Sequence, residues 1–446
     1  MSRLLALAER NVPRYTSYPT APHFNASVGA SVYSDWLGAL ASDATLSLYL
    51  HVPYCAQMCF YCGCHTKAVR RREPVDLYAA RLSDEIGVIG ALAGRRRVVH
   101  LHWGGGTPSI LGEEQLGAIV ARLAAGFDLS TIVEHAIELD PRRMSLTLAR
   151  ALAAIGVNRA SLGVQDFAPH VQRAIGRNQP FAQVQAAADW LRVAGIERLN
   201  IDLMYGLPRQ STQDVAESAA LAASLAPQRL ALFGYAHVPW FKTHQRLIAE
   251  ADLPGAAERL EQARVAAETL ATHGSVPIGL DHFARPDDEL AVAQRAGRMH
   301  RNFQGYTADA ADALIWLGTS AIGRLPQGFV QNAVDTGGYF RAVQAGRPAT
   351  VKGLALTPDD RLRGRIIERL RCDLAVDLDA MHEPGCAGET FAAELDALAP
   401  LAAEGVVAVE GRRITVTEAG RPLVRLVAAA LDAYLPQNRS RHSIAV

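Results

Sequence analysis

The chain has 446 residues, and its 45 Lys and Arg residues balance its 45 Asp and Glu residues. A formal net charge of zero argues against broad electrostatic binding to nucleic acid, which depends on clustered basic side chains. The chain is 49% hydrophobic and 20% charged, a composition typical of a globular protein and not of a disordered one. Its length allows two or three domains, or one barrel of about 250 residues with additions.

The N-terminus shows no export signal. Its apolar run from Leu4 to Ala8 is followed by Glu9 and Arg10, which makes it too short for a secretory signal or a membrane span. No later segment reaches the roughly 18 uncharged apolar residues that a transmembrane helix needs. We therefore expect a cytoplasmic protein without a membrane partner, in which the cysteines stay reduced and need an explanation other than disulfides.

Strand-like and helix-like segments alternate through the first half of the chain. The expected strands cover residues 45–53, 98–103, 135–139, 159–164, 198–204 and 229–235, and helical spacing covers residues 75–92, 113–125, 145–155, 181–194 and 212–225. Such alternation predicts parallel strands joined by right-handed helical crossovers. We expect an α/β fold, a partial (β/α)6 barrel that is open on one side, because the rhythm is lost after residue 239.

Polar or glycine-containing motifs follow each expected strand. The second strand ends in glycines 104–106, and later strands end near Glu138, Gln165 and Asp202. Barrel enzymes bind substrates at the carboxyl ends of their parallel strands, so these motifs predict one shared site. The glycine run has two possible interpretations: it forms a tight turn, or it lets a ligand approach the backbone closely.

Four of the six cysteines, Cys55, Cys59, Cys62 and Cys64, lie within ten residues. Structural zinc sites usually pair two cysteine knuckles across a longer loop, and here no second knuckle follows. Three cysteine ligands and an open iron fit the spacing better, so the pattern favours an iron–sulfur cluster over zinc or a redox thiol pair.

Other histidines and cysteines have ordinary explanations. His51, His100 and His102 lie on expected strands, where hydrogen-bonded histidines are commoner than metal ligands. Cys372 and Cys386 lie far downstream, and we expect them to behave as small buried hydrophobic residues.

The composition changes near residue 351. Helical runs at 358–371 and 391–404 precede a hairpin at 405–417 and a final helix at 420–434, an order that resembles a winged helix. A DNA-binding wing should be basic, but residues 351–446 contain 12 basic and 14 acidic side chains. We therefore expect three parts: an N-terminal substrate-side extension (1–44), the barrel with its extension (45–345), and a mainly helical, winged-helix-like domain (346–446) that covers the barrel.

Several motifs resemble a known family. C-x3-C-x2-C followed by GGGTP is similar to the radical S-adenosylmethionine superfamily. RYTSYPT (14–20), YLHVPYC (49–55) and HWGGGTPS (102–109) resemble, within it, the oxygen-independent coproporphyrinogen III dehydrogenases. Further matches are GVQDF (163–167), NIDLMYGLP (200–208), GYAHVPW (234–240), DHFARPDDELAVAQ (281–294) and HRNFQGYT (300–307). The resemblance covers about residues 11–335 and weakens beyond them.

The resemblance implies that two propionates of coproporphyrinogen III are oxidatively decarboxylated to vinyl groups, giving protoporphyrinogen IX. It also implies a [4Fe-4S] cluster held by Cys55, Cys59 and Cys62. The open iron would bind S-adenosylmethionine, whose 5′-deoxyadenosyl radical would take hydrogen from the propionate β-carbon before carbon dioxide leaves and an acceptor takes an electron. A donor protein such as flavodoxin would supply the electrons. Separately, the balanced charge of the chain gives no reason to expect more than a monomer.

The resemblance also implies two S-adenosylmethionine molecules. The first would meet Tyr49, Gly105, Glu138 and Ile322, and the second Tyr61, Gly106, Thr107, Gln165, Arg177, Asp202 and Ala236. Glycine permits close approach, carboxylates accept hydrogen bonds from hydroxyl or amino groups, and Arg177 can pair with a methionine carboxylate. Tyr49 and Cys64 are further candidates for the chemistry, although Cys64 matches a family cysteine that is not an iron ligand.

The substrate carries four propionates, so its pocket should offer cations, for which Arg14 and Arg285 are candidates. Three other functions compete with this interpretation: a haem chaperone of the same superfamily, a haem-degrading methyltransferase, and a zinc-stabilised regulator that uses the C-terminal wing. The chaperones typically have Phe at the position of Cys64 and lack RYTSYPT, which favours the decarboxylase. Brown, oxygen-bleachable protein would exclude zinc as the main metal.

Overall fold

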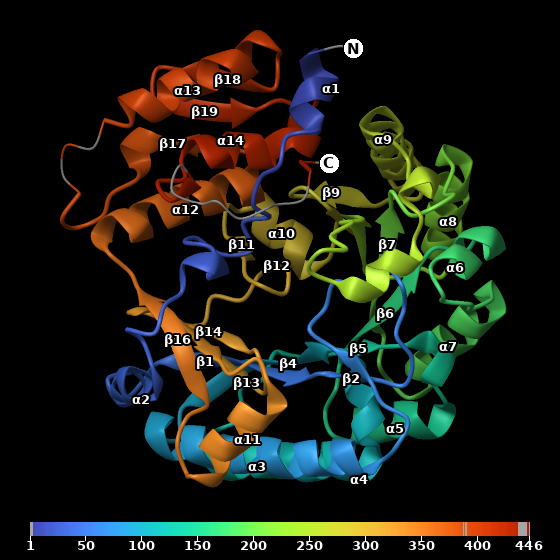
Figure 1. Ribbon diagram of the computed structural model, residues 1–446, viewed down its shortest axis with the longest axis vertical. Coiled ribbons are helices and arrows are strands. Elements are labelled where there is room, and N and C mark those ends of the chain that lie inside the picture. Colours follow the sequence, from blue (N-terminus) through green and yellow to red (C-terminus); the bar gives the residue numbers. More distant parts are fainter. Residues whose placement is uncertain (1–2, 387, 389, 436–443, 446) are drawn as a thin grey trace.

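The computed structural model describes residues 3–386, 388, 390–435 and 444–445. At its centre lies a twisted sheet of 12 strands in the order β16-β15-β14-β13-β1-β4-β5-β6-β7-β8-β10-β9 (Figure 1). Its strands are β1 (Thr45–Val52), β4 (Arg97–Gly105), β5 (Glu134–Leu139), β6 (Arg159–Gln165), β7 (Arg198–Tyr205), β8 (Arg229–Gly234), β9 (Val276–Ile278), β10 (His282–Ala284), β13 (Ala313–Leu317), β14 (Ile322–Leu325), β15 (Gly328–Asn332) and β16 (Thr350–Ala355).

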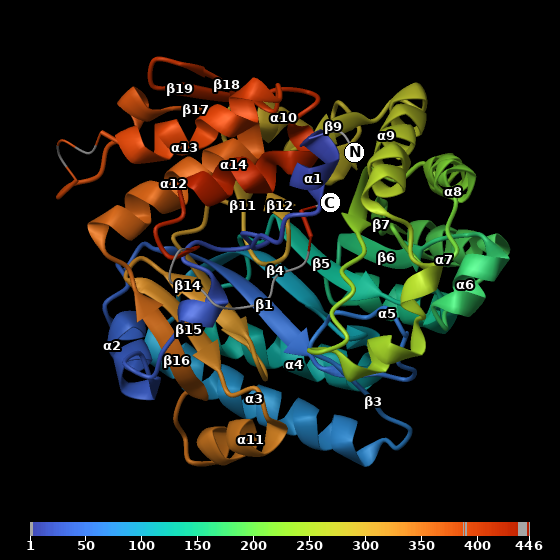
Figure 2. The same cartoon turned by 45° about the horizontal axis from the view of Figure 1, so that its top comes forward.

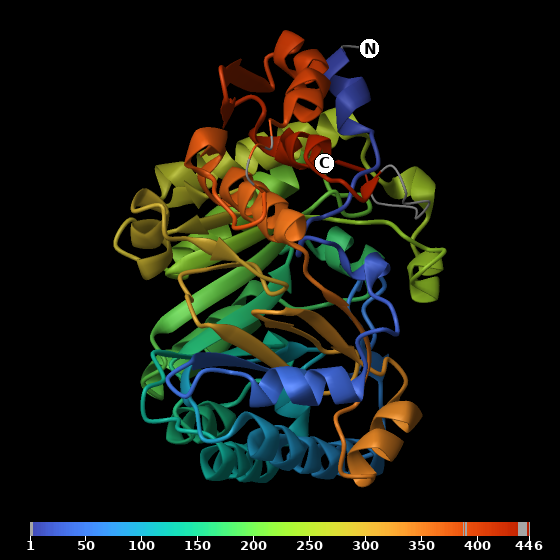
Figure 3. The same cartoon turned by 90° about the vertical axis from the view of Figure 1, so that its left-hand side faces the viewer.

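Helices lie along the outer side of this sheet and make up most of the C-terminal region (Figures 1 and 3). They are α1 (Arg3–Ala8), α2 (Ala30–Gly38), α3 (Glu73–Ala93), α4 (Glu113–Gly126), α5 (Leu146–Ala154), α6 (Pro169–Ala174), α7 (Phe181–Val193), α8 (Thr212–Ser224), α9 (Ala256–Thr272), α10 (Glu289–Arg295), α11 (Thr336–Gln344), α12 (Pro358–Asp373), α13 (Ala392–Ala403) and α14 (Val424–Ala430). Two short strand pairs lie apart from the main sheet, β2 (Tyr54–Cys55) with β3 (Lys67–Ala68) and β11 (His300–Arg301) with β12 (Tyr306–Thr307).

The six expected strands are confirmed as β1, β4, β5, β6, β7 and β8, and each pairs in parallel with the next. The expected crossover helices are α3, α4, α5, α7 and α8. The α/β class and the six-stranded partial barrel are therefore confirmed. Parallel strands place all their carboxyl ends at one edge, where the motifs gather.

Both faces of β1 are covered. Leu46, Leu48 and Leu50 alternate along the strand and are buried in the main hydrophobic core, to which α3 adds apolar residues at helical spacing. Tyr49 and His51 point to the opposite face and are also buried. A strand buried on both faces is typical of a parallel sheet inside an α/β fold, and its second face turns toward the site.

The sheet continues beyond the six expected strands on both sides. β13 pairs in parallel with β1, and β14, β15 and β16 follow as antiparallel neighbours. At the other edge, β10 and β9 pair antiparallel to β8 and to each other. The sequence did not indicate these strands because they are short and are not separated by regular crossover helices.

The C-terminal region is helical with a small antiparallel sheet, β17 (Ala375–Asp377), β19 (Arg413–Val416) and β18 (Val407–Glu410). The expected hairpin is β18 with β19. The final helix is shorter than the expected 420–434, since α14 ends at Ala430. The reason is a tertiary contact: the backbone N–H of Ala433 donates to the Tyr18 hydroxyl at 3.1 Å instead of continuing the helix.

The N-terminal segment lies against the C-terminal region in all three views (Figures 1, 2 and 3). Ala8, Val12, Tyr15 and Tyr18 belong to the same buried cluster as the apolar side chains of α12, α13 and α14. The three-part division at residues 44/45 and 345/346 stays a prediction, and hydrogen bonding places β16, beyond the second boundary, in the main sheet.

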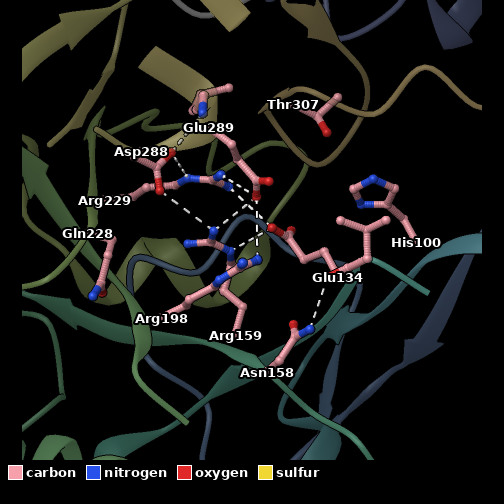
Figure 4. A network of polar contacts seen from close by, with 12 residues as sticks. His100, Glu134, Asn158, Arg159, Arg198, Gln228, Arg229, Asp288, Glu289 and Thr307 are labelled. Carbon is pink, nitrogen blue, oxygen red and sulfur yellow. Dashed lines mark hydrogen bonds and ion pairs between the residues drawn. The ribbon is translucent and has the colours of Figure 1, made fainter. Parts of the chain in front are cut away.

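A balanced ion network closes the opposite ends of the parallel strands. Arg159, Arg198 and Arg229 begin β6, β7 and β8, and they face the carboxylates of Glu134, Asp288 and Glu289 (Figure 4). Arg229 Nε donates to Asp288 Oδ1 at 2.8 Å, and Arg159 Nε donates to Glu134 Oε2 at 2.7 Å. Three cations meet three carboxylates at the edge remote from the expected site, which indicates a structural role.

Among the described residues, no helix is long and apolar enough to cross a membrane.

Candidate active site

The cysteine loop begins where β1 ends. β2 carries Cys55 and pairs with β3 on the far side of the loop. Cys55, Cys59, Cys62, Cys64 and Cys372 form no disulfide. Cys372 is fully buried, as expected, and Cys386 is partly buried against the C-terminal core.

A segment after β8 holds the cysteine loop by its backbone. His244 Nε2 lies 2.7 Å from the carbonyl oxygen of Cys62, and Lys242 Nζ donates to that of Cys64 at 2.8 Å. Gln245, which is fully buried, donates to the carbonyl oxygen of Tyr61 at 2.8 Å and accepts from the Val238 N–H at 2.6 Å. The segment that follows β8 therefore orients the loop that follows β1.

The cysteine sulfurs already have hydrogen-bond donors. Thr66 and Thr107 place their hydroxyls 3.4 Å from Cys55 Sγ. Arg177 Nη1 lies 3.5 Å from Cys59 Sγ, and Arg142 Nη2 lies 3.7 Å from it. Donors and cations directed at sulfur are suited to thiolate ligands, whose charge they stabilise.

Cys62 and Cys64 interact with each other. The hydrogen bond from the Cys64 thiol lowers the pKa of Cys62 to about 7 and raises the pKa of Cys64 well above its usual value. Burial raises the pKa of Cys55. Of these two closely spaced thiols, Cys62 is the one whose pKa is lowered.

The glycine run packs against two neighbouring elements. A Cβ on Gly104 would lie 2.6 Å from the Tyr49 hydroxyl, and one on Gly106 would lie 2.5 Å from the Tyr54 carbonyl oxygen. Gly105 has a φ of +107°, which side chains disfavour, and its N–H donates to Glu138 Oε2 at 3.1 Å. The run is both a tight turn and a place where the backbone lies open beside a carboxylate.

The end of β6 is irregular at Gln165. This residue has a φ of +73°, and the register of β6 with β7 shifts between Gly163 and Gln165. Such strained backbone often occurs at functional sites.

Arg177 and Asp140 form an ion pair beside this strand end, in which Arg177 donates to Asp140 at 3.3 Å. Burial alone would raise the pKa of Asp140, but Arg142 and Arg177 outweigh it and hold that pKa below its usual value.

Asp202 lies on β7 and accepts a hydrogen bond from Ser161 Oγ at 2.9 Å and one from Asn200 Nδ2 at 2.7 Å. Burial, together with the nearby Glu138, raises the pKa of Asp202 to about 6. The carboxyl group of Asp202 therefore lies in a polar but poorly hydrated position among the carboxyl ends of the parallel strands.

These groups line one cavity of about 990 Å³. The expected residues that line it are Cys55, Cys59, Cys62, Cys64, Tyr61, Gly105, Gly106, Thr107, Glu138, Gln165, Arg177, Asp202 and Ala236. Apolar walls come from residues such as Leu232, Phe233 and Phe303. The cavity thus combines a thiol loop, backbone amides, carboxylates and a large apolar space.

Two expected cofactor residues are not among the lining residues. Tyr49 is buried, with its ring centroid 4.1 Å from that of Trp316 and 5.6 Å from that of His102. Ile322 begins β14. Of the two candidate substrate arginines, Arg14 lines the cavity, whereas Arg285 lies outside it and pairs with Asp287 at 3.2 Å.

Sequence reasoning missed several residues of this site. Arg142 follows β5, so the strand-end rule could have found it. His244 and Gln245 lie in a short helix, Thr243–Leu247, well beyond the end of β8. Arg301 and Arg371 also line the cavity, but no local pattern marks either one. Two of the three strand histidines are hydrogen-bonded as expected, since His51 Nε2 lies 3.0 Å from the His65 carbonyl oxygen and His102 Nε2 lies 3.4 Å from Glu138. His100 Nε2 lies 3.9 Å from Asp309 Oδ1.

The donor set fits an iron–sulfur cluster, because cluster irons are held by cysteine thiolates. Cys55, Cys59 and Cys62 line the cavity on one loop, and backbone amides and carboxylates beside it suit a zwitterionic amino-acid cofactor.

Comparisons with known proteins agree with this geometry. Residues 49–222 match the family model of the radical SAM superfamily, and residues 356–423 match that of the HemN C-terminal domain. The fold and the cysteine loop define the chain as a radical S-adenosylmethionine protein with a [4Fe-4S] cluster.

Known proteins that match nearly the whole chain identify the family within this superfamily. The chain is 48% identical to the oxygen-independent coproporphyrinogen III oxidase of Bradyrhizobium diazoefficiens, covering 99% of both chains, and 42% identical to that of Paracoccus denitrificans, covering 99% and 98%. The solved structure of the Escherichia coli coproporphyrinogen III oxidase superposes with a TM-score of 0.88 at 38% identity, covering 95% of this chain and 100% of that one. This chain belongs to the family of oxygen-independent coproporphyrinogen III oxidases.

Proposed function

We propose that this protein oxidatively decarboxylates two propionate side chains of coproporphyrinogen III to vinyl groups and so forms protoporphyrinogen IX. The observation that carries the proposal is the single cavity of about 990 Å³, which joins the cysteine loop to a large apolar and cationic space. Cofactor pockets for small ligands reach about 1,000 Å³, so this cavity has room for a tetrapyrrole next to the cofactor residues.

The cofactor end is built from the residues already described. We propose that Cys55, Cys59 and Cys62 hold the cluster, and that Glu138, Arg177 and Asp202 orient S-adenosylmethionine with the backbone of residues 105–107. When bound, the cluster and S-adenosylmethionine supply a reducing electron and a hydrogen-abstracting 5′-deoxyadenosyl group.

The protein's own part is binding, orientation and exclusion of water. Arg177 can pair with a cofactor carboxylate, as bidentate arginines do, while Asp140 and Cys59 fix its position. Glu138 can accept hydrogen bonds from an amino group or hydroxyl while it holds the Gly105 N–H. Apolar walls such as Leu232 and Phe303 keep water from competing for a reactive group.

The remaining expectations are proposals. We propose a cytoplasmic monomer that receives electrons from a reducing protein such as flavodoxin and has no nucleic-acid or membrane partner. We propose that Tyr49 and Ile322, which lie on β1 and β14, also contact the cofactor. A role for Cys64 beside the cluster or on the substrate side is likewise proposed.

An anaerobic turnover assay tests the function. Reconstituted, reduced protein is mixed with S-adenosylmethionine and coproporphyrinogen III, and both products are measured by mass spectrometry. Loss of two carbon dioxide molecules together with 5′-deoxyadenosine is the expected result. 5′-Deoxyadenosine with an unchanged tetrapyrrole would instead support a haem-related function on the same scaffold.

A further inference from the structure

Three arginines from distant parts of the chain line the same cavity. Arg14 belongs to the N-terminal segment, Arg301 to β11, and Arg371 to the last turn of α12. These elements lie together beside the C-terminal helices (Figures 1 and 2). The cysteine loop, in contrast, follows β1, and the glycine run lies at the end of β4.

The contacts of these arginines are mostly with neutral groups. Arg14 Nη2 donates to the Gly234 carbonyl oxygen at 2.9 Å, and Arg371 Nη1 donates to the Arg14 carbonyl oxygen at 2.6 Å. The guanidinium of Arg301 lies 4.6 Å from the centre of the Tyr306 ring. Backbone carbonyls and an aromatic ring position a guanidinium without neutralising its charge.

Buried donors of this group lack partners. Arg371 is 1% exposed, and its Nε has no hydrogen-bond partner among the described residues. Arg301 is similar, since its side chain is 9% exposed and neither its Nε nor its Nη1 has a hydrogen bond within the described part of the chain. Buried guanidinium donors without partners are costly and uncommon, so a ligand that accepts hydrogen bonds is expected beside them.

The local charge is also unbalanced. In the described part of the chain, Asp281 is the one carboxylate in an ion pair with any of the three arginines, at 3.9 Å from Arg301 Nη1. Asp281 already accepts from His282 Nδ1 at 2.8 Å. The network in Figure 4 is an internal comparison, since there three arginines meet three carboxylates.

The pKa shifts of Arg371 and Arg14 agree with an excess of positive charge. For Arg301, in contrast, burial is outweighed by Tyr306 and Asp281, which raise its pKa. Burial, and then the neighbouring Arg301, lowers the pKa of Arg371. Arg14 retains accessible surface on the cavity side, yet the surrounding protein is close enough that burial lowers its pKa as well. A ligand with carboxylate groups would relieve this repulsion.

We propose that Arg14, Arg301 and Arg371 form a subsite that binds carboxylate groups of the tetrapyrrole's propionate side chains. The inference rests on the proposed function, because that function supplies a substrate with four propionates. Arg425 supports the subsite by donating to the carbonyl oxygens of Val12 and Pro13, which positions the segment that carries Arg14. The N-terminal segment and the C-terminal helices thereby take part in substrate recognition.

The test compares two probes on reconstituted anaerobic holoenzyme: coproporphyrinogen III and its uncharged tetracarboxamide. The variants are Arg14→Gln and Arg301→Gln, because loss of Arg371 would also release the N-terminal segment. Each variant should raise the dissociation constant for the acid about tenfold, the typical effect of a charge-assisted hydrogen bond, and leave that for the amide unchanged. Arg301→Lys should recover part of the loss.

Arg192→Gln is the matched control. Arg192 also donates to a backbone carbonyl oxygen, that of Leu225, at 2.5 Å, but it does not line the cavity, so binding of both probes should stay at the wild-type level. Unchanged binding of the acid by both test variants would overturn the subsite. Equal weakening of acid and amide would also overturn it, in favour of a structural role. Failure of the wild-type enzyme to bind coproporphyrinogen III would instead overturn the proposed function.

Discussion

Arg177 and Cys59 are in direct contact: the arginine Nη1 lies 3.5 Å from the cysteine Sγ. Arg177 follows α6, which is itself preceded by the irregular end of β6, whereas Cys59 belongs to the loop after β1. The contact therefore joins the proposed cluster loop to the proposed cofactor residues. Burial lowers the pKa of Arg177, but Tyr61, Asp140 and Cys59 outweigh this effect, so the pKa is raised and the side chain stays charged.

Arg177→Gln should weaken binding of S-adenosylmethionine while the cluster remains. Loss of one charge-assisted contact corresponds to about 1.5–3 kcal/mol, or roughly a 10- to 100-fold increase in the dissociation constant. Equilibrium binding to the anaerobically reconstituted protein measures it, together with iron content. Arg173→Gln on α6 is the control, since Arg173 is exposed. Unchanged affinity in Arg177→Gln would remove this residue from the cofactor site.

The four clustered cysteines should divide into three ligands and one bystander. Cys55→Ser, Cys59→Ser or Cys62→Ser should abolish stable reconstitution of the cluster, because each removes one of three thiolate ligands. Cys64→Ser should keep the wild-type iron and sulfide content. Cys372→Ser is the matched control, because Cys372 is fully buried on α12 and does not line the cavity. Loss of the cluster in Cys64→Ser, with retention in Cys62→Ser, would reverse the assignment.

Glu85 should make stability depend on pH. It is 1% exposed, and it accepts from Gly318 N–H at 2.6 Å and from the Tyr339 hydroxyl at 2.7 Å. Burial raises its pKa from 4.5 to about 7. The folded state therefore holds the proton more tightly than the unfolded state, so this stabilisation is complete below about pH 4.5 and is lost as the pH rises through about 7.

Denaturant unfolding of Glu85→Gln measures that loss. Glutamine cannot ionise, so the free energy of unfolding of the wild type relative to Glu85→Gln should fall by about 3 kcal/mol between about pH 4 and pH 8. The same comparison with Glu258→Gln should stay flat, since Glu258 is exposed. A difference independent of pH for Glu85→Gln would contradict the raised pKa.

The ion network at the amino ends of β6, β7 and β8 should stabilise the folded state. Arg229→Met leaves Glu134, Asp288 and Glu289 with too little positive charge, and breaking a buried pair costs about 3–5 kcal/mol. Arg198→Met is the internal control because its side chain is 44% exposed and reaches Glu289 only at 3.8 Å, which predicts a change below about 1 kcal/mol. Equal effects in chemical denaturation would show that the network does not act as a buried unit.

The six parallel strands could be predicted because each is a short apolar run followed by a helix of regular spacing. The predicted site residues at the strand ends follow from the same rule, which is why Glu138, Gln165 and Asp202 gather around one cavity. The outer strands β13–β16 could not be predicted in this way. Their pairing is antiparallel or with the distant β1, and nothing local specifies it.

The arginine subsite was equally hidden in the sequence. Arg371 lies in the last turn of a helix with four other arginines, where a basic residue ordinarily faces solvent and stabilises the helix dipole. Arg301 lies on a two-residue strand. Only the packing of the N-terminal segment, β11 and α12 brings these residues to the cavity, and such long-range contacts leave no periodic signal.

The most direct test of the account follows the hydrogen removed from the substrate. Coproporphyrinogen III with deuterium at the propionate β-carbons is incubated anaerobically with reconstituted, reduced protein and S-adenosylmethionine. The proposed function predicts deuterium in the recovered 5′-deoxyadenosine together with a divinyl tetrapyrrole. Deuterium-free 5′-deoxyadenosine and a tetrapyrrole that keeps all four propionates would contradict it.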